Sequence, residues 1–223
     1  SYHLGWEDRT GDPEPSGRSD RIHGSTCLAT SLAITGGSEA TLPAAAAVEM
    51  VNSFTEIHDD IQGGKQLRGH RDAVWTVWGP AQAINAGDGM HALARLALLR
   101  LMERGVSSEN TFLATQLLDR ASLRLCEGRF DDLEAQEKIN VSVAQYFKMA
   151  TAKSGALLGC AMQLGAVTVW ADKKDALSAL FECGSKIGVA LQVNNDLREF
   201  WSISSDPSTS AIEVLNKKKL LPV

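Results

Sequence analysis

The sequence lacks several features that would place it in a familiar class of proteins. Aromatic residues make up only 6% of its 223 residues, although 44% are hydrophobic. A core must therefore be built mainly from Ala, Leu and Val. No apolar run approaches the roughly 20 residues that cross a membrane, and no secretory signal is visible. These absences predict a protein with a large apolar core and no membrane span.

Cysteines are few and widely spaced, and they form no C-x-x-C pair. The four are Cys27, Cys126, Cys160 and Cys183. Such spacing favours reduced, buried thiols in a cytoplasmic protein over a disulfide framework or a zinc site.

An excess of positive charge is also missing, since the formal net charge is -5. This argues against a nucleic-acid partner, which usually requires a basic footprint. If the ligand is a phosphate ester, metal ions held by carboxylates would have to reverse the local charge.

Strand signals are nearly absent, because alternating Val/Ile/Thr patterns between turn pairs do not occur. Apolar residues instead recur every three or four positions, which is typical of helices. We predict an all-α single domain over 1–223, with helices of about 12 to 25 residues around an apolar centre. The predicted helices span 26–35, 43–60, 75–104, 109–126, 143–164 and 173–200, with loops at 1–21, 127–140 and 202–210. The helix at 75–104 is predicted to be interrupted near Gly79-Pro80.

The helix that Pro43 opens ends in a carboxylate pair, Asp59 and Asp60, followed by basic or titratable residues. Asp59 and position 63 share a face, since residues four apart are neighbours on a helix. Carboxylates at both positions would chelate a hard cation from one side. Position 63 is Gly, so half of that binding capacity is missing.

The last predicted helix carries a second polar cluster in "NNDLRE", formed by Asn195, Asp196 and Glu199. Hard cations such as Mg²⁺ take oxygen ligands and keep several waters. One or two carboxylates from each helix, together with phosphate oxygens of a ligand, would suffice. The alternative is a solvated helix face, which paired acids on helices usually form.

Other polar and aromatic residues allow two interpretations each. Lys153 lies in an Ala/Leu/Gly-rich segment, where its side chain either extends to solvent or meets an anion. Trp75 and Trp78 are core residues or stabilise a cationic substrate. His58 and His70 are general bases or hydrogen-bonded structural residues.

Five segments, taken in order, resemble the trans-polyprenyl diphosphate synthase family. They are "VEMVNSFTEIHDDIQ", "AVWTVWGPAQAINAGDGM", "AKSGALLG", "KIGVALQVNNDLREFW" and "NKKKLLPV". The resemblance implies the isoprenoid synthase fold, a helical bundle around an apolar cavity, usually as a homodimer. It also implies that an allylic diphosphate binds through Mg²⁺ held by two Asp-rich helices. The last segment is similar to a late loop, beyond which the family carries further helices.

The resemblance assigns roles to particular positions. The metal ligands would be Asp59, Asp60, Asn195, Asp196 and Glu199. The substrate-binding residues would be Arg68, Lys153, Gln192 and Phe54, and the catalytic residues would be Asp59, Asp60, Lys153 and Asp196. Trp75 is added to the substrate-binding residues because of its aromatic ring. Phe54, about five residues before Asp59, would form the tunnel floor and favour a short to medium chain.

The departures from the family pattern concern both diphosphate sites. Gly63 and Asn195 stand where the pattern has Asp, which weakens the metal site. At the isopentenyl diphosphate site, Asp20 stands in place of Lys, His23 in place of an Arg, and Gly69 in place of another. Arg contacts to diphosphate are hard to replace, so binding of isopentenyl diphosphate should be much weaker.

Three hypotheses follow. The first is a terpene synthase-like enzyme that ionises an allylic diphosphate with Mg²⁺ and then cyclises, deprotonates or hydrates the cation. The second is a prenyltransferase that elongates with isopentenyl diphosphate or uses another acceptor. The third is a non-catalytic member, either a prenyl-binding protein or a regulatory subunit that pairs with an active paralogue.

Overall fold

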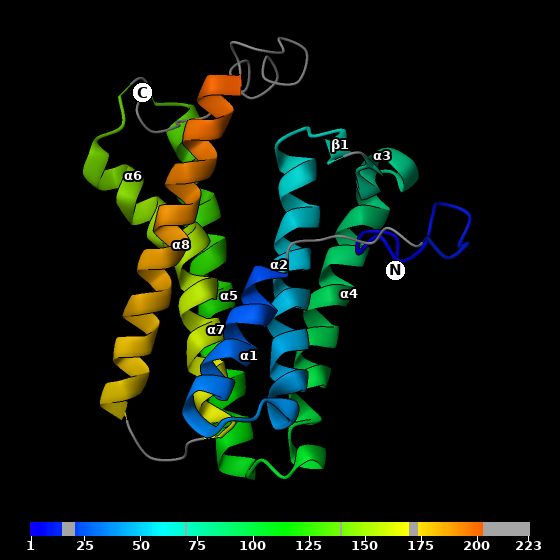
Figure 1. The fold of residues 1–223 in the computed structure, drawn as a ribbon. Helices are drawn as coiled ribbons and strands as arrows, with labels where there is room; N and C mark the ends of the chain where they lie inside the picture. Colours follow the sequence, from blue (N-terminus) through cyan, green and yellow to red (C-terminus); the bar gives the residue numbers. More distant parts are fainter. Residues whose placement is uncertain (15–20, 70, 139, 170–173, 203–223) are drawn as a thin grey trace.

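The computed structural model describes residues 1–14, 21–69, 71–138, 140–169 and 174–202. The helices are α1 (Ile22–Thr35), α2 (Leu42–Gln62), α3 (Val74–Trp78), α4 (Pro80–Leu99), α5 (Ser108–Gln136), α6 (Val143–Ala150), α7 (Ala156–Val167) and α8 (Lys174–Ser202). Short helical segments are η1 (Glu39–Thr41), η2 (Met102–Arg104) and the π-helical η3 (Thr151–Gly155). The fold is the predicted all-α bundle (Figure 1).

One small sheet was not predicted. The two-residue strands β1 (Leu67–Arg68) and β2 (Arg71–Asp72) pair antiparallel after α2. Two residues per strand are too few for a period-two pattern to be recognised in the sequence.

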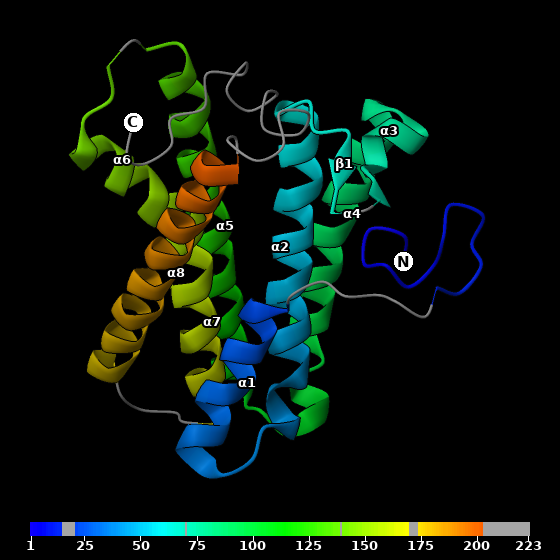
Figure 2. The same cartoon turned by 45° about the horizontal axis from the view of Figure 1, so that its top comes forward.

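The helices form two neighbouring groups. Helix α2 packs chiefly against α4, and α7 packs against α8, α1 and α5. Figures 1 and 2 show α2, α5 and α8 running in the same direction, so their carboxyl ends lie at one end of the bundle. The two predicted acidic clusters, near the ends of α2 and α8, are therefore brought to the same end of the molecule.

Helix α2 is positioned by its apolar stripe. Pro43 stands in its first turn, where a missing backbone N–H costs nothing. Val48 and Val51 are fully buried in the main core, while Ile57 lies in a second cluster with Val74 and Ala83. The helix ends before Gly63, and the chain then turns at Gly64 with φ of 62°, a left-handed conformation that suits glycine.

The predicted end of the helix at 109–126 was wrong, because α5 continues from 126 to Gln136. The segment was predicted as a loop because it is polar. One face of it is buried, however, at Gly128, Asp132 and Ala135. A Cβ on Gly128 would lie 2.6 Å from the backbone nitrogen of Lys153, so a close approach to η3 holds this turn in place.

The thiol prediction was half right. Cys27 and Cys160 are buried and unpaired, whereas Cys126 and Cys183 are exposed. Burial raises the pKa of Cys160 to about 12, so the buried thiols stay protonated and unreactive.

Helix α8 meets a length and composition criterion for crossing a membrane, the one helix of the described residues to do so. The window Asp175–Arg198 has a mean hydropathy of 1.2, and 17% of it is buried. Core helices of soluble proteins meet the same criterion, so this is weak evidence for a span.

Small residues let α7 and α8 approach closely. A Cβ on Gly159 would lie 2.7 Å from the carbonyl oxygen of Phe181, and one on Gly184 would lie 2.6 Å from that of Leu158. These distances are shorter than any real Cβ contact, so the two helices meet backbone to backbone. This contact sets where α8 presents its polar residues.

Replacing Gly159 by Leu should lower the free energy of unfolding by about 2 to 3 kcal/mol, because overpacking forces the helices apart. Gly89→Ala is the matched control, since Gly89 lies on α4 with nothing within 4 Å of its added Cβ. The control should be neutral or stabilising by up to about 1 kcal/mol. Urea denaturation followed by circular dichroism measures both, and equal stability of the two variants would contradict the packing argument.

Candidate active site

A cavity of about 710 Å³ lies between α2, α5, η3 and α8. Six of the residues predicted from the sequence line it: Phe54, Asp59, Arg68, Lys153, Gln192 and Asn195. Leu157 and Leu158 of α7 add apolar wall. The cavity therefore combines a polar end, formed by the ends of α2 and α8, with an apolar interior.

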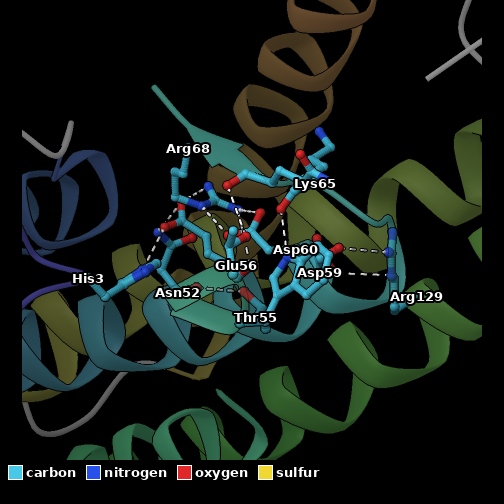
Figure 3. A network of polar contacts seen from close by, with 12 residues as sticks. His3, Asn52, Thr55, Glu56, Asp59, Asp60, Lys65, Arg68 and Arg129 are labelled. Atoms are coloured by element: carbon cyan, nitrogen blue, oxygen red, sulfur yellow. Dashed lines mark hydrogen bonds and ion pairs between the residues drawn. The ribbon is translucent and has the colours of Figure 1, made fainter. Parts of the chain in front are cut away.

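Asp60 does not face this cavity. It is 2% exposed and accepts two hydrogen bonds from Arg68, at 2.9 Å from Nε and 2.8 Å from Nη2. Figure 3 shows Arg68 reaching back from the β-hairpin over the last turns of α2. Asp60, predicted as a metal ligand, and Arg68, predicted to bind diphosphate, thus form an ion pair with each other.

Glu56 completes this cluster one turn earlier on α2. Its carboxylate lies 3.4 Å from Nη1 of Arg68 and 3.2 Å from the imidazole of His3. Burial opposes ionisation of Glu56, but the hydrogen bond from His3 and the charge of Arg68 outweigh it, so its pKa is lowered. Burial likewise opposes the charge of Arg68, but its hydrogen bond to Asp60 outweighs this and raises the pKa of Arg68. Glu56 and Arg68 are therefore both charged near neutral pH.

Asp59, with a side chain 30% exposed, has a different partner. Its Oδ1 lies 3.0 Å from Nε of Arg129 on α5. Arg129 also lies 2.8 Å from Asp132, which in turn lies 2.7 Å from Nζ of Lys153. Alternating charges therefore run from α2 through α5 to the π-helical segment. Lys153 meets an anion, which decides between the two interpretations of that residue.

The second predicted cluster is divided between the core and the cavity. Asp196 is 1% exposed and accepts hydrogen bonds from Tyr146 at 2.5 Å and from Gln192 at 2.7 Å. Gln192 accepts in turn from Ser154 at 2.6 Å. Burial, the hydrogen bond to Asp196 and nearby negative charge all raise the pKa of Tyr146, so its hydroxyl stays a donor. Asp196 is thus a buried anchor, and its neighbour Asn195 lines the cavity.

The donor set for a metal ion is smaller than predicted. Among the described residues no three His, Cys, Asp or Glu side chains form a metal-binding group, and the side chain of Glu199 lies outside the described part. Asp60 and Asp196 are buried with protein partners. Asp59 and Asn195 remain at the cavity, and their oxygens fit an ion that also takes waters and ligand oxygens.

Two aromatic predictions have different outcomes. Phe54 lines the cavity and packs its ring edge-on against His58, with ring centroids 4.8 Å apart. His58 is packed tightly, since a Cβ on Gly87 would lie 2.3 Å from its Nε2. Trp75 does not line the cavity. Its indole N–H donates to the carbonyl of Lys65 at 2.7 Å, and its ring packs in the cluster of Ile57, so a cation-stabilising role for Trp75 finds no support.

His23 occupies the region that the family pattern reserves for an Arg. It lines the cavity, and its Nδ1 is buried without a hydrogen-bond partner. Burial lowers the pKa of His23 to about 4, although the charge of Glu56 opposes this. His23 is therefore neutral near pH 7 and supplies no charge to a diphosphate. Asp20 and His70 lie outside the described residues.

Sequence reasoning missed Arg129, Asp132 and Tyr146, and it missed the ion pair that Glu56 forms with Arg68. Arg129 and Asp132 are three residues apart in a segment predicted as loop, so their shared helix face was not recognised. Glu56 stands one turn before Asp60 on a helix that was predicted correctly. Its pairing depends on Arg68, which the hairpin brings back to α2.

Together, the helical bundle and this polar-ended apolar cavity define an isoprenoid synthase-type fold. A profile of the family described as Polyprenyl synthetase matches residues 15–211. The chain belongs to the polyprenyl synthetase family.

Known relatives agree with this assignment. The chain is 36% identical to the geranylgeranyl diphosphate synthase of Mycobacterium tuberculosis, with all of this chain and 62% of that protein aligned. It is 31% identical to the (2E,6E)-farnesyl diphosphate synthase of the same organism, over 100% of this chain and 61% of that protein. The chain thus spans about three fifths of the length of these curated relatives.

Solved structures show the same fold. The polyprenyl synthetase of Streptomyces coelicolor superposes with a TM-score of 0.87 at 34% identity, covering all of this chain and 64% of that one. A polyprenyl synthase of Caulobacter crescentus, solved with calcium and isoprenyl diphosphate, gives 0.79 at 28% identity over 92% of this chain and 60% of that one. The curated relatives are prenyl diphosphate synthases, which supports the prenyltransferase hypothesis. Terpene synthase-like cyclisation finds no support in them.

Arg68→Met should destabilise the fold, because it leaves the buried carboxylate of Asp60 without its cation. Removing one partner of a buried ion pair costs about 3 to 5 kcal/mol. Arg68 is itself 36% exposed, so we expect a loss of about 2 kcal/mol or more in urea denaturation. Arg100→Met is the control, since Arg100 and Glu103 are both exposed and such pairs contribute less than about 1 kcal/mol. Equal losses would show that the Asp60 pair is not needed for stability.

Proposed function

We propose that this chain forms the allylic-substrate site of a trans-prenyl diphosphate synthase, which joins an allylic diphosphate to isopentenyl diphosphate. The observation that carries the proposal is the single cavity that unites Asp59, Lys153 and Asn195 with apolar walls. The diphosphate would lie at the polar end and the prenyl chain in the interior. Relatives with prenyl diphosphate synthase names support the same activity.

Asp59 and Asn195 would hold Mg²⁺ together with diphosphate oxygens, because hard cations prefer oxygen ligands. When bound, the ion supplies positive charge that stabilises the departing diphosphate. Lys153 adds positive charge at the same end of the cavity, paired with Asp132 at 2.7 Å. Ser154 and Gln192 orient each other beside it. A calcium-bound relative solved with isoprenyl diphosphate supports a divalent ion.

The apolar interior would receive the prenyl chain and exclude water from the allylic cation. Phe54 and His58 narrow the cavity on the α2 side through their edge-on contact. We propose that this contact limits the chain to a short or medium length. Chain length is then set by packing between α2 and α4, since His58 rests against Gly87.

The acceptor side is proposed to bind isopentenyl diphosphate weakly. His23 is neutral at pH 7 because burial lowers its pKa to about 4, and Gly69 stands where the family pattern has an Arg. Each missing charged contact removes about 1.5 to 3 kcal/mol. The Michaelis constant for isopentenyl diphosphate should therefore be high.

A homodimer stays a prediction, as does a cytoplasmic location. Helix α4 exposes Leu93, Leu96 and Leu99, each about half exposed, at a spacing of three residues. These leucines lie on one side of the helix, so they offer an apolar surface for a second copy. Pairing with an active paralogue would use the same surface.

Incubation with Mg²⁺, isopentenyl diphosphate and C10 or C15 allylic diphosphates tests the activity, with products identified by mass spectrometry. We expect prenyl diphosphates longer by one or more five-carbon units, and Asp59→Ala should reduce the rate at least about a hundredfold because it removes the charged ligand at the cavity. Asp88→Ala, on α4 and mostly exposed, is the control. Hydrocarbons or alcohols would instead support the terpene synthase-like hypothesis, and unchanged substrate would support a non-catalytic member.

Gly63→Asp should strengthen metal binding, because Gly63 lines the cavity four residues after Asp59. An added Cβ lies 3.1 Å from the carbonyl of Asp59, which the end of a helix can accommodate by a small shift. We expect Mn²⁺ to bind about tenfold more tightly in an electron paramagnetic resonance titration. Gly89→Asp adds the same charge on α4, away from the cavity, and should change nothing. Equal affinities of the two variants would contradict the role of position 63.

A further inference from the structure

Arg129 stands apart from the other cations of the cavity. Its side chain is 15% exposed, and its guanidinium contacts four oxygens from two helices. The contacts are Asp59 Oδ1 at 3.0 Å, Asp132 Oδ2 at 2.8 Å, Gln62 Oε1 at 2.7 Å and the Asp59 carbonyl at 3.5 Å. Figure 3 shows it beside Asp59, directed at the end of α2.

The guanidinium of Arg129 lies where negative charge accumulates at the end of α2. The end of α2 combines the carboxylate of Asp59 with the negative end of the helix dipole. Asp59 is also the charged metal ligand that remains at the cavity. A cation held there by four oxygens competes with a metal ion for Asp59, and it uses Oδ1, so that Oδ2 is left for a metal.

Arg129 is one of the residues that line the cavity, so its side chain can meet a ligand. A planar fork with several N–H donors suits a phosphate group, which it binds at two oxygens. Asp132 is 2% exposed and holds Arg129 and Lys153 at 2.8 and 2.7 Å. This buried carboxylate therefore fixes two cations side by side at the polar end.

We propose that Arg129 is a built-in cation of the diphosphate site, which takes over part of the work of a metal ion. It holds one oxygen of Asp59, lowers the affinity of that carboxylate for divalent ions, and binds diphosphate oxygens itself. The inference rests on the proposed function in one respect, namely that the ligand is a diphosphate. It also accounts for Gly at position 63. A carboxylate there would help to bind a metal ion, and Arg129 of α5 supplies positive charge in place of that ion.

A purely structural role is the competing explanation, because Arg129 also joins α2 to α5. Arg95 offers a matched control for it. Arg95 joins α4 to Asp119 of α5 by two hydrogen bonds, at 2.9 and 2.5 Å, and does not line the cavity. Loss of either arginine removes one interhelical ion pair and one positive charge. Only the loss of Arg129 should change the affinities for Mn²⁺ and pyrophosphate.

The test compares the wild-type chain with Arg129→Gln and Arg95→Gln, with Mn²⁺ and inorganic pyrophosphate as probes. Mn²⁺ alone is titrated by electron paramagnetic resonance, and pyrophosphate without metal by calorimetry. Arg129→Gln should bind Mn²⁺ about tenfold more tightly and pyrophosphate about tenfold more weakly. Arg95→Gln should match the wild type. Both affinities of Arg129→Gln within about twofold of the wild type would overturn the proposal, as would weaker Mn²⁺ binding.

Arg129→Lys keeps the test decisive if the Gln variant does not fold. A lysine retains the charge but cannot hold Asp59 and Asp132 with one planar fork. It should bind Mn²⁺ about threefold more tightly than the wild type, and unchanged affinity would overturn the proposal. Neither probe needs turnover. A wild type that forms no product, with both affinities shifted in Arg129→Gln, would refute the proposed reaction and leave the diphosphate site in place.

Discussion

Carboxylates at the carboxyl end of α2 lie where the helix dipole is already negative, and the rest of the site depends on how that charge is balanced. Two arginines balance it from opposite sides. Arg68 returns from the β-hairpin to hold the buried Asp60, and Arg129 reaches across from α5 to hold Asp59. The first pair fixes the end of the helix, and the second leaves its carboxylate at the cavity. One sequence motif of two adjacent aspartates thus contains a buried residue and one that lines the cavity.

The same division recurs on α8. Asp196 is buried and bonded to Tyr146 and Gln192, while Asn195 faces the cavity. In both clusters a carboxylate is buried with protein partners, and the neighbouring residue lines the cavity. Since an unpaired buried charge is costly, the two buried carboxylates require partners, which are Arg68 for Asp60 and Tyr146 and Gln192 for Asp196. This explains why the donor set for a metal ion is smaller than the count of acidic residues suggests.

Much of the site was accessible from the sequence because helical periodicity is local. The stripe of Val48, Val51 and Ile57 predicted α2, and the resemblance to the family predicted that Phe54 and Asp59 of that helix lie at the substrate cavity. The continuation of α5 was missed because polar residues from 127 to 136 signal a loop when their environment is unknown. Burial of Asp132 against Arg129 and Lys153 reverses that signal. Trp75 was predicted to contact the substrate because it is aromatic. Its packing beside Ile57 depends on the direction in which the chain turns at Gly79, between α3 and α4, and periodicity does not predict that direction.

By itself, the sequence determined an all-α chain of the polyprenyl synthetase type, since apolar spacing and the order of five motifs are properties of the chain. It also showed that Gly63 and Asn195 stand where the family pattern has Asp. Only the tertiary structure decided which acidic residues face the cavity and which are buried. That decision depends on cations brought from β1, α5 and η3, whose positions follow from helix packing and not from distance along the chain. The charge of a buried carboxylate is balanced by the cations that lie close to it in space, because the Coulomb interaction depends on the distance between the charges and on the low dielectric around them.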